Sequence, residues 1–185
     1  MSYREVIDAL DSADAEVRQA ARSRLLEMGR DVVEPLIEAM YTQSGRKAWE
    51  AAVILGQIDD PRWRDPMCEM LTSAHPMLGQ IAANALLRFG TDCVDALLAA
   101  LPNSSYLTQI AIIDVLGKIG DRRVVAPLLK LLGECTGSTL CYMLIEALGR
   151  LGDPRSIEAI RPFLDDADHH VRKRAQNALN LLANN

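Results

Sequence analysis

Few residues of this sequence are placed to perform chemistry. Its three histidines are His75, His169 and His170, and the last two would point in different directions from the start of one helix. The motifs GxSxG, HExxH, GxxxxGKS/T and GxGxxG, which mark hydrolases, metalloproteases and nucleotide-binding enzymes, do not occur. We therefore expect no catalytic residues, no metal site and no cofactor, and we favour a protein that is not an enzyme.

The four cysteines are Cys68, Cys93, Cys135 and Cys141, and no two of them form a CxxC pair. In a cytosolic chain, the simplest interpretation is that all four are reduced and pack as small apolar side chains. Cys135 and Cys141 could supply half of a zinc site, but no other His or Cys stands at a spacing that would complete it.

Charge and hydropathy disfavour two classes of partner. The formal net charge is −5 at pH 7 and no long basic stretch occurs, which argues against broad binding to nucleic acid or to an anionic membrane. No apolar run reaches the roughly 20 residues that span a bilayer, and the first ten residues, MSYREVIDAL, lack the apolar core of a signal peptide. We expect a soluble, cytoplasmic protein whose partner is another protein.

The elements that must position any site repeat along the chain. One residue ends a helix in each repeat, in the order Gly29, Asp59, Gly90, Gly120 and Gly152, with spacings of 30, 31, 30 and 32 residues. A fixed period of this length indicates a stacked array of helix pairs. The predicted pairs span residues 2–29, 31–58, 60–90, 92–120, 122–152 and 154–183, and they form a single domain over residues 1–185.

Each predicted pair has the same order of elements. A side-chain oxygen can accept hydrogen bonds from the free N–H groups of a first turn, so polar residues before each helix predict its start. The predicted caps of the first helices are Asp31, Asp60, Asp92, Asp121 and Asp153. Those of the second helices are Asp14, Ser44, His75, Ser105, Gly137 or Ser138, and Asp168. Pro66 and Pro127 lie inside first helices and should kink them or delay their regular turn.

Two motifs are similar to those of a known family. The boundaries LGKIGDRR at 116–123 and LGRLGDPR at 148–155 share the pattern LGxxGDxR, and the pattern DxxVRxxA occurs at 14–21 and 168–175. On these residues the chain resembles HEAT-repeat proteins of the phycobilisome-lyase-like family over nearly its whole length. The resemblance implies an all-α fold, a right-handed α-solenoid of six HEAT-like helical hairpins, whose second helices line a concave groove.

The second helices direct one set of residues away from their buried stripe. In the last helix the stripe is Val171, Ala175, Ala178, Leu179 and Leu182. Lys173 points away from this stripe, and the equivalent positions of the other helices, with those one turn before and after, give the candidate partner-binding residues. They are Trp49, Val53, Gln80, Asn84, Tyr106, Ile110, Asp114, Tyr142 and Glu146.

These residues allow two interpretations. In an open groove they would hold a helix or an extended peptide with apolar anchors and a basic residue, which Asp114 and Glu146 could meet. In a tightly curled array, Trp49, Ile110 and Tyr142 would pack into the core, and the two carboxylates would be ordinary solvated groups.

The arginine of the DxxVRxxA pattern occurs only in the two end pairs. Its column reads Arg18, Ala48, Gly79, Gln109, Cys141 and Arg172, and we interpret it as a loss of positive charge and bulk in the middle of the groove. The first and last helices carry polar residues suited to end caps, which argues against end-to-end stacking and favours a monomer.

The functional expectation is a non-catalytic protein-binding scaffold or adaptor. The family resemblance implies an alternative, a bilin lyase or bilin chaperone acting on a phycobiliprotein. In that alternative the cofactor is a bilin, and Trp49, Tyr106 and Tyr142 would contact the flat tetrapyrrole.

Overall fold

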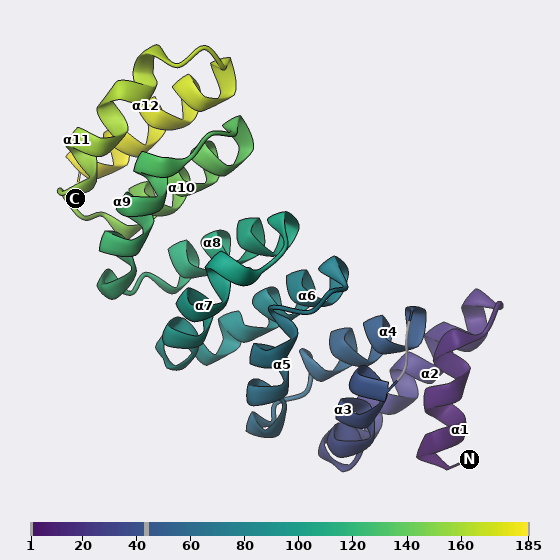
Figure 1. Cartoon of the computed structure of the whole chain (residues 1–185). Helices are drawn as coiled ribbons and strands as arrows, with labels where there is room; N and C mark the ends of the chain where they lie inside the picture. Colours follow the sequence, from purple (N-terminus) through teal and green to yellow (C-terminus); the bar gives the residue numbers. More distant parts are fainter. Residues whose placement is uncertain (1, 43–44, 185) are drawn as a thin grey trace. The chain divides into compact units, whose positions relative to one another are not determined.

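The structure is a computed structural model that describes residues 2–42 and 45–184, and among these residues it contains helices and turns but no strand (Figure 1). Contacts divide the chain into two compact units, unit 1 over Met1–Arg88 and unit 2 over Phe89–Asn185. Each unit consists of three helix pairs. The predicted all-α fold of six helical hairpins is confirmed, whereas the single domain stays a prediction.

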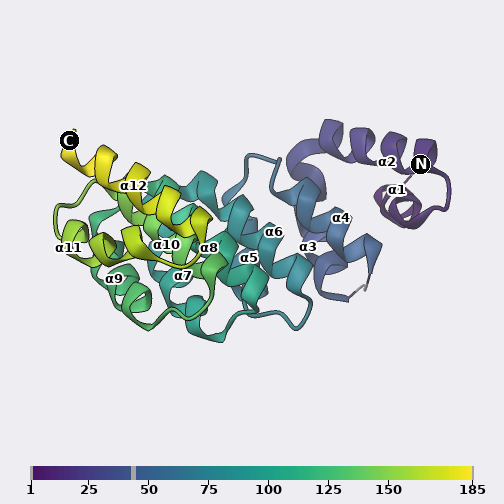
Figure 2. The same ribbon diagram turned by 90° about the horizontal axis from the view of Figure 1, so that it is seen from above.

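Unit 1 contains two layers of helices. The first helices are α1 (Tyr3–Asp8), α3 (Val33–Thr42) and α5 (Arg64–Met70), and the second helices are α2 (Ala15–Met28), α4 (Arg46–Leu55) and α6 (Pro76–Leu86). Helix α4 contacts both α2 and α6, so that the second helices form one layer (Figure 2). This layer presents the outward residues of unit 1.

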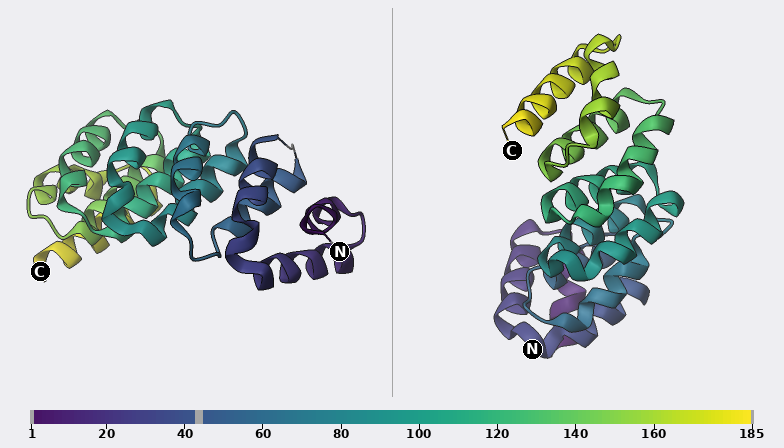
Figure 3. Two further views of the ribbon diagram at one scale, coloured as in Figure 1. Left: turned by 90° about the horizontal axis from the view of Figure 1, so that it is seen from below. Right: turned by 90° about the vertical axis from the view of Figure 1, so that its left-hand side faces the viewer.

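Unit 2 has the same organisation. Its first helices are α7 (Val94–Ala100), α9 (Val125–Glu134) and α11 (Ser156–Ile160), and its second helices are α8 (Tyr106–Ile119), α10 (Ser138–Leu151) and α12 (His169–Ala183). Helix α10 packs between α8 and α12, which places these three side by side (Figures 2 and 3).

Short 3₁₀ turns precede several first helices and explain their prolines. The turns η2 (Gly29–Val32), η3 (Pro61–Trp63) and η6 (Arg122–Val124) lead into α3, α5 and α9. Pro35, Pro66 and Pro127 are each the third residue of the α-helix that follows. A first-turn residue needs no N–H partner inside its helix, so the prolines fit, and the expected delay of the regular turn is confirmed.

Most predicted helix caps are confirmed. Among the first helices, Asp60, Asp121 and Asp153 each accept a hydrogen bond from the backbone N–H two residues ahead. Among the second helices, Asp14, Ser105 and Asp168 do the same for their first turns. His75 and Gly137 occupy the cap positions of α6 and α10 without a side-chain bond.

Two predicted caps are wrong. Asp31 lies inside η2 and Asp92 lies inside η4 (Leu87–Cys93), and neither caps a helix. At Gly29 and Gly90 the backbone turns with φ of 57° and 54°, and 3₁₀ turns then run directly into the next helix. No separate cap residue is needed there. Ser44 lies outside the described residues, and Gly45 stands at the start of α4.

The second helices cross at glycines that the sequence analysis did not explain. A Cβ on Gly117 would lie 2.8 Å from Cβ of Ala147, and one on Gly149 would lie 2.7 Å from Cβ of Ala178. These are the first glycines of the two LGxxGDxR motifs. In unit 1, a Cβ on Gly56 would lie 3.1 Å from Cβ of Ala85. We call these three residues the seam glycines, because they allow close approach of neighbouring helices.

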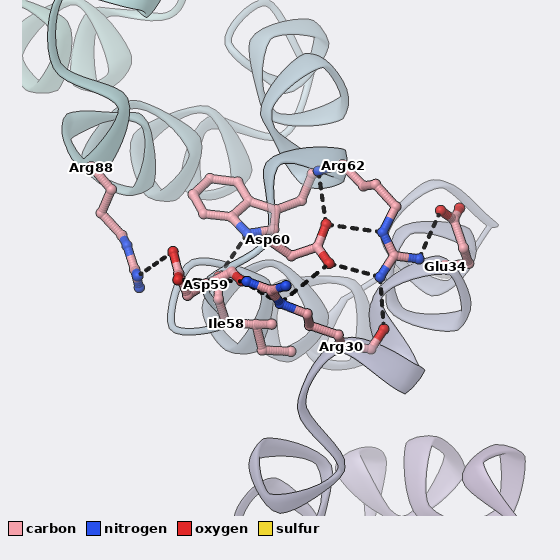
Figure 4. Close-up of polar contacts among 8 residues, drawn as sticks. Arg30, Glu34, Ile58, Asp59, Asp60, Arg62 and Arg88 are labelled. Carbon is pink, nitrogen blue, oxygen red and sulfur yellow. Dashed lines mark hydrogen bonds and ion pairs between the residues drawn. The ribbon is translucent and has the colours of Figure 1, made fainter.

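Aspartate–arginine pairs tie neighbouring helix pairs together. Figure 4 shows Asp60 accepting hydrogen bonds from Nε and Nη2 of Arg62 at 2.9 and 2.7 Å. The same guanidinium donates to the carbonyl of Arg30 at 2.8 Å and contacts Glu34, both in the preceding pair. Asp121 and Arg123 repeat the arrangement in unit 2, where Arg123 reaches Asp95 and the carbonyl of Thr91. Both aspartates therefore cap a first turn, and both arginines link that turn to the preceding helix pair.

Candidate partner-binding faces

The outward residues of each unit are described as one face. The unit 1 face consists of Gln19, Ser23, Trp49, Val53, Gln80 and Asn84, and the unit 2 face consists of Tyr106, Ile110, Asp114, Lys118, Tyr142, Glu146, Arg150, Lys173, Arg174 and Asn177. None of the nine candidate residues is buried: Asn84 and Tyr106 are exposed and the other seven are partly exposed. Trp49, Ile110 and Tyr142 are therefore not sealed into a core.

The unit 1 face carries no charged side chain. Trp49 and Val53 lie on α4, and the amides of Gln80 and Asn84 follow on α6. A hollow of about 400 Å³ beside Trp49 is lined by Arg18, Arg46 and Met77, among others. The arginines hold backbone carbonyls, since Arg18 donates to Ser12 and Ala13 and Arg46 donates to Ser12. Glu50 and His75 also line the hollow, so Trp49 is bordered there by polar and charged side chains.

The unit 2 face begins with an apolar part on α8. Tyr106 is 51% exposed, and Ile110 follows one helical turn later with partial exposure. Leu107, beside Tyr106, is also 45% exposed. Large apolar side chains that lie next to one another on the surface can bind the apolar side chains of a partner.

Farther along the same face, ion pairs form a ladder across three helices. Asp114 on α8 accepts hydrogen bonds from Lys118 at 2.6 Å and from Arg150 at 2.7 Å. Glu146 on α10 accepts one from Arg150 at 2.6 Å and forms an ion pair with Arg174 on α12 at 2.9 Å. Each carboxylate therefore contacts two cations, and Arg150 is shared between the two carboxylates.

The ladder argues against the interpretation in which Asp114 and Glu146 meet a basic residue of the partner, because both carboxylates already have cationic partners. Burial of Asp114 disfavours its charged form, yet hydrogen bonds from Lys118 and Arg150 outweigh this effect and lower the pKa of Asp114 below its ordinary value. The carboxylates are 22% and 21% exposed, whereas Lys118, Arg150 and Arg174 are 44%, 35% and 38% exposed. An approaching partner meets the cations first.

Tyr142 is part of a basic hollow. The guanidinium carbon of Arg174 lies 5.4 Å from the centre of the Tyr142 ring, within range of a cation–π interaction. A hollow of about 360 Å³ next to this pair is also lined by His170, Lys173 and Asn177. Its lining therefore offers donors and positive charge around one aromatic ring.

The arginine column has a structural role that replaces the earlier interpretation. Arg18 donates to the carbonyls of Ser12 and Ala13, and Arg172 donates to those of Asp166 and Ala167. Each arginine thus fastens the turn of its own helix pair. At the equivalent position, Gln109 donates to the carbonyl of Ser104 at 3.3 Å.

In the fifth pair a disulfide takes this position. Cys141 is bonded to Cys135, with a Cα–Cα distance of 5.7 Å. The expectation of four reduced cysteines is therefore wrong for this pair, whereas Cys68 and Cys93 form no disulfide. Cys135 and Cys141 are six positions apart, as are Ser12 and Arg18, so comparison of the columns could have revealed the link. Each of these positions faces the turn, which brings the two sulfurs together.

Within residues 2–42 and 45–184, no three His, Cys, Asp or Glu side chains gather to hold a metal ion. Over the same part of the chain, no helix is long and apolar enough to cross a membrane. What the two faces supply is apolar and aromatic surface in unit 1, and aromatic surface with positive charge in unit 2.

Comparison with protein families agrees with the repeat pattern. Residues 65–141 match HEAT repeats, and residues 140–166 match the PBS lyase HEAT-like repeat. The uncharacterized phycocyanin operon protein Z of Pseudanabaena tenuis is 27% identical to this chain over 180 residues, which cover 94% of this chain and 76% of that protein.

Solved structures with a similar fold are helical-repeat proteins. Human deoxyhypusine hydroxylase in complex with glycerol has a TM-score of 0.59 at 22% identity, covering 99% of this chain and 74% of that one. A designed armadillo repeat protein in complex with the peptide (KR)4 has a TM-score of 0.62 at 14% identity, covering 98% of this chain and 100% of that one. At these identities the likeness concerns the fold alone. The six hairpins and these structures together identify an all-α helical-repeat fold, in which residues 65–141 match HEAT repeats and residues 140–166 match the PBS lyase HEAT-like repeat.

Proposed function

We propose that the chain is a non-catalytic protein-binding scaffold whose second-helix faces hold a helix or an extended peptide of a partner protein. The observation that carries this proposal is the partial exposure of aromatic and apolar side chains at equivalent outward positions, above all Trp49, Tyr106 and Ile110. Helical-repeat proteins of this fold can hold peptides, as the designed armadillo protein with (KR)4 illustrates. Large amphipathic side chains of this kind are the usual anchors of such interfaces.

The proposal is tested by placing a photo-crosslinking amino acid at single positions of the full chain. Gln80 reports on the unit 1 face and Asn177 reports on the unit 2 face. Exposed positions on first helices, Glu38 on α3 and Ala126 on α9, are the matched controls. We expect one discrete crosslinked protein from a face position in the source cells and none from the controls. Equal crosslinking from both layers would remove the binding role of the faces.

A second candidate function is bilin handling, as a lyase or a chaperone for a phycobiliprotein. Two observations favour it: the PBS lyase HEAT-like match over residues 140–166, which include Tyr142, and the related phycocyanin operon protein. Tyr142 and Arg174 would then contact the flat ring system of the bilin. The test is absorption spectroscopy of a free bilin mixed with the pure chain, with Tyr142→Ala as the variant and Tyr41→Ala, which changes an exposed tyrosine of the first helix α3, as its control. A shifted and sharpened band that Tyr142→Ala abolishes would support this candidate, and an unchanged spectrum would exclude it.

A further inference from the structure

The unit 2 face carries more positive than negative charge, although the whole chain is acidic. Four cations lie on this face, Lys118, Arg150, Lys173 and Arg174. They stand against two carboxylates, those of Asp114 and Glu146, which the ladder already saturates. The net charge of the chain is −5, so the excess of positive charge on this face is local.

Lys173 is the one of these four cations that is not part of the ladder. No ion pair or hydrogen bond involves its ammonium group among the described residues, and its side chain is exposed. It lines the hollow of about 360 Å³ together with Arg174, His170, Asn177 and the Tyr142 ring. No carboxylate of the described residues lines this hollow, and Glu146, which pairs with Arg174 from outside the lining, is the acceptor with which an incoming anion would compete.

We infer that the unit 2 face recognises an acidic peptide segment, with a Glu or Asp side chain of the partner seated between Lys173 and Arg174 and an apolar neighbour against Tyr142. This inference rests on the proposed function, because it names the partner chemistry of a face that the proposal makes a binding surface. It reverses the charge expected of the partner from the sequence, since that expectation treated Asp114 and Glu146 as unpaired. Charge complementarity of this kind selects partners and suppresses those of like charge.

A short acidic peptide fits this surface better than a nucleic acid does. Nucleic-acid binding depends on many phosphate contacts and a broad basic surface, whereas this face offers four cations, of which three are shared with carboxylates. Tyr106 and Ile110 on the same face provide places for apolar anchors. A few acidic side chains among apolar ones match both parts of the surface.

The test is a titration of the full, isotope-labelled chain with blocked peptides that differ in charge alone, followed by NMR. One peptide alternates Leu with Glu, and the two matched peptides carry Gln or Lys in place of Glu. We expect the Glu peptide to shift the amide signals of Tyr142, Lys173 and Asn177, and to bind on the order of tenfold more tightly than the Gln peptide. Raising the salt concentration from about 50 mM to about 500 mM should remove most of that difference.

Lys173→Glu is the decisive variant, because it reverses one exposed charge and leaves the ladder intact. It should abolish the preference for the Glu peptide and give a preference for the Lys peptide. Lys130→Glu is the matched control, since Lys130 is an exposed lysine of the same unit on α9, in the other layer. This control should leave the preference for the Glu peptide unchanged.

Four results would overturn the inference. Equal binding of the three peptides at this face would remove the charge preference while leaving peptide binding, and thus the proposed function, in place. Absence of any peptide-induced shift in unit 2 would remove the inference and leave the crosslinking test to decide the proposed function. Tighter binding of a short single-stranded oligonucleotide to the same residues would favour a nucleic-acid partner instead. Equal effects of Lys173→Glu and Lys130→Glu would show non-specific attraction.

Discussion

Units 1 and 2 place their second helices in the same register, yet they treat charge at the outward positions in opposite ways. At the positions equivalent to Asp114 and Glu146, and one turn before them, unit 1 has Trp49, Val53 and uncharged polar side chains, with no ionised group. At equivalent positions unit 2 has Asp114 and Glu146, each paired to two cations. Register thus determines the direction of a side chain, whereas the neighbouring helices determine whether its charge is available to a partner.

The two units also differ in how closely their second helices approach. In unit 2 a methyl group on Gly117 or Gly149 would meet both Cβ and Cα of an alanine within 2.9 Å, whereas in unit 1 one on Gly56 would meet only Cβ of Ala85, at 3.1 Å. Unit 2 in addition holds the Cys135–Cys141 disulfide. The comparison therefore predicts that unit 2 is the more tightly constrained of the two.

The largest effect is expected at a seam glycine. Gly149→Ala should lower the free energy of unfolding by about 2–3 kcal/mol, because the added methyl group lies too close to the backbone of Ala178 to be accommodated without helix movement. Gly56→Ala should cost less, about 1 kcal/mol, since its one tight contact, with Cβ of Ala85 at 3.1 Å, requires only a small shift of the neighbouring helix. Urea unfolding followed by circular dichroism measures both values.

Gly133→Ala is the control for this series. Gly133 lies in α9, and a Cβ there would have no atom within 4 Å. Alanine should stabilise this helix by roughly 0.5–1 kcal/mol because it restricts the unfolded chain and favours helix. If Gly149→Ala proved as stable as Gly133→Ala, the close crossing of α10 and α12 would be wrong.

Next in size is the loss of a buried ion-pair partner in unit 1. Glu50 has a side chain 7% exposed, and Arg22 alone, among the described residues, donates hydrogen bonds to its carboxylate, at 2.6 and 3.1 Å. Arg22→Met should cost about 2–3 kcal/mol because the carboxylate stays buried without a partner. Arg150→Met in unit 2 should cost only about 1 kcal/mol, since Asp114 and Glu146 keep Lys118 and Arg174. Urea midpoints of the two variants decide the order, and a larger loss for Arg150→Met would contradict it.

The disulfide should contribute a stabilisation of about 2 kcal/mol through closure of its short loop. Cys141→Ser should therefore lower the urea midpoint of the oxidised protein, whereas Cys68→Ser, which changes a free and partly exposed cysteine, should not. Alkylation of the unfolded, unreduced protein followed by mass spectrometry should modify two cysteines, and reduction should raise that number to four. Four reactive thiols before reduction would contradict the link.

The smallest effect is a pH dependence shared by the two units. Hydrogen bonds from the side chain and backbone of Arg62 lower the pKa of Asp60 to about 2, and those of Arg155 lower the pKa of Asp153 to about 2. A carboxyl whose pKa is lower in the folded state stabilises fully above its ordinary pKa of about 4 and loses that contribution as the pH falls toward 2. The urea midpoint should therefore fall between about pH 4 and about pH 2.

Asp60→Asn and Asp153→Asn should each reduce the fall in the urea midpoint between about pH 4 and about pH 2, because asparagine does not bind a proton in this pH range. Asp31→Asn is the matched control, since Asp31 lies in η2 and caps no helix. An equal reduction by all three substitutions would show that the fall in the urea midpoint does not come from the capping aspartates.

Much of the fold could be predicted because its signals are local. The glycine period, the capping aspartates and the first-turn prolines each act within a few residues, and they placed all six hairpins. Asp31 and Asp92 were misjudged because glycine with positive φ allowed the chain to enter the next helix without a cap.

The site could be predicted only in part. The buried stripe of the last helix gave the direction of Trp49, Ile110 and Tyr142, since direction follows from helical periodicity. The partners of Asp114 and Glu146 could not be predicted in the same way. Arg150 lies 36 residues from Asp114 in sequence, and their contact depends on how α8 and α10 pack. Binding by these residues stays a prediction.

The seam glycines have a consequence for the history of the molecule. Each contact needs a glycine in one repeat and an alanine in the next, as for Gly117 with Ala147 and Gly149 with Ala178. Compatibility is therefore encoded in adjacent repeats and not in any one of them. Duplication of a contiguous block of repeats preserves every glycine–alanine contact inside the block. Exchange of a single hairpin must instead satisfy the contacts on both of its sides at once. Proteins of this kind are therefore expected to lengthen by duplication of neighbouring repeats together.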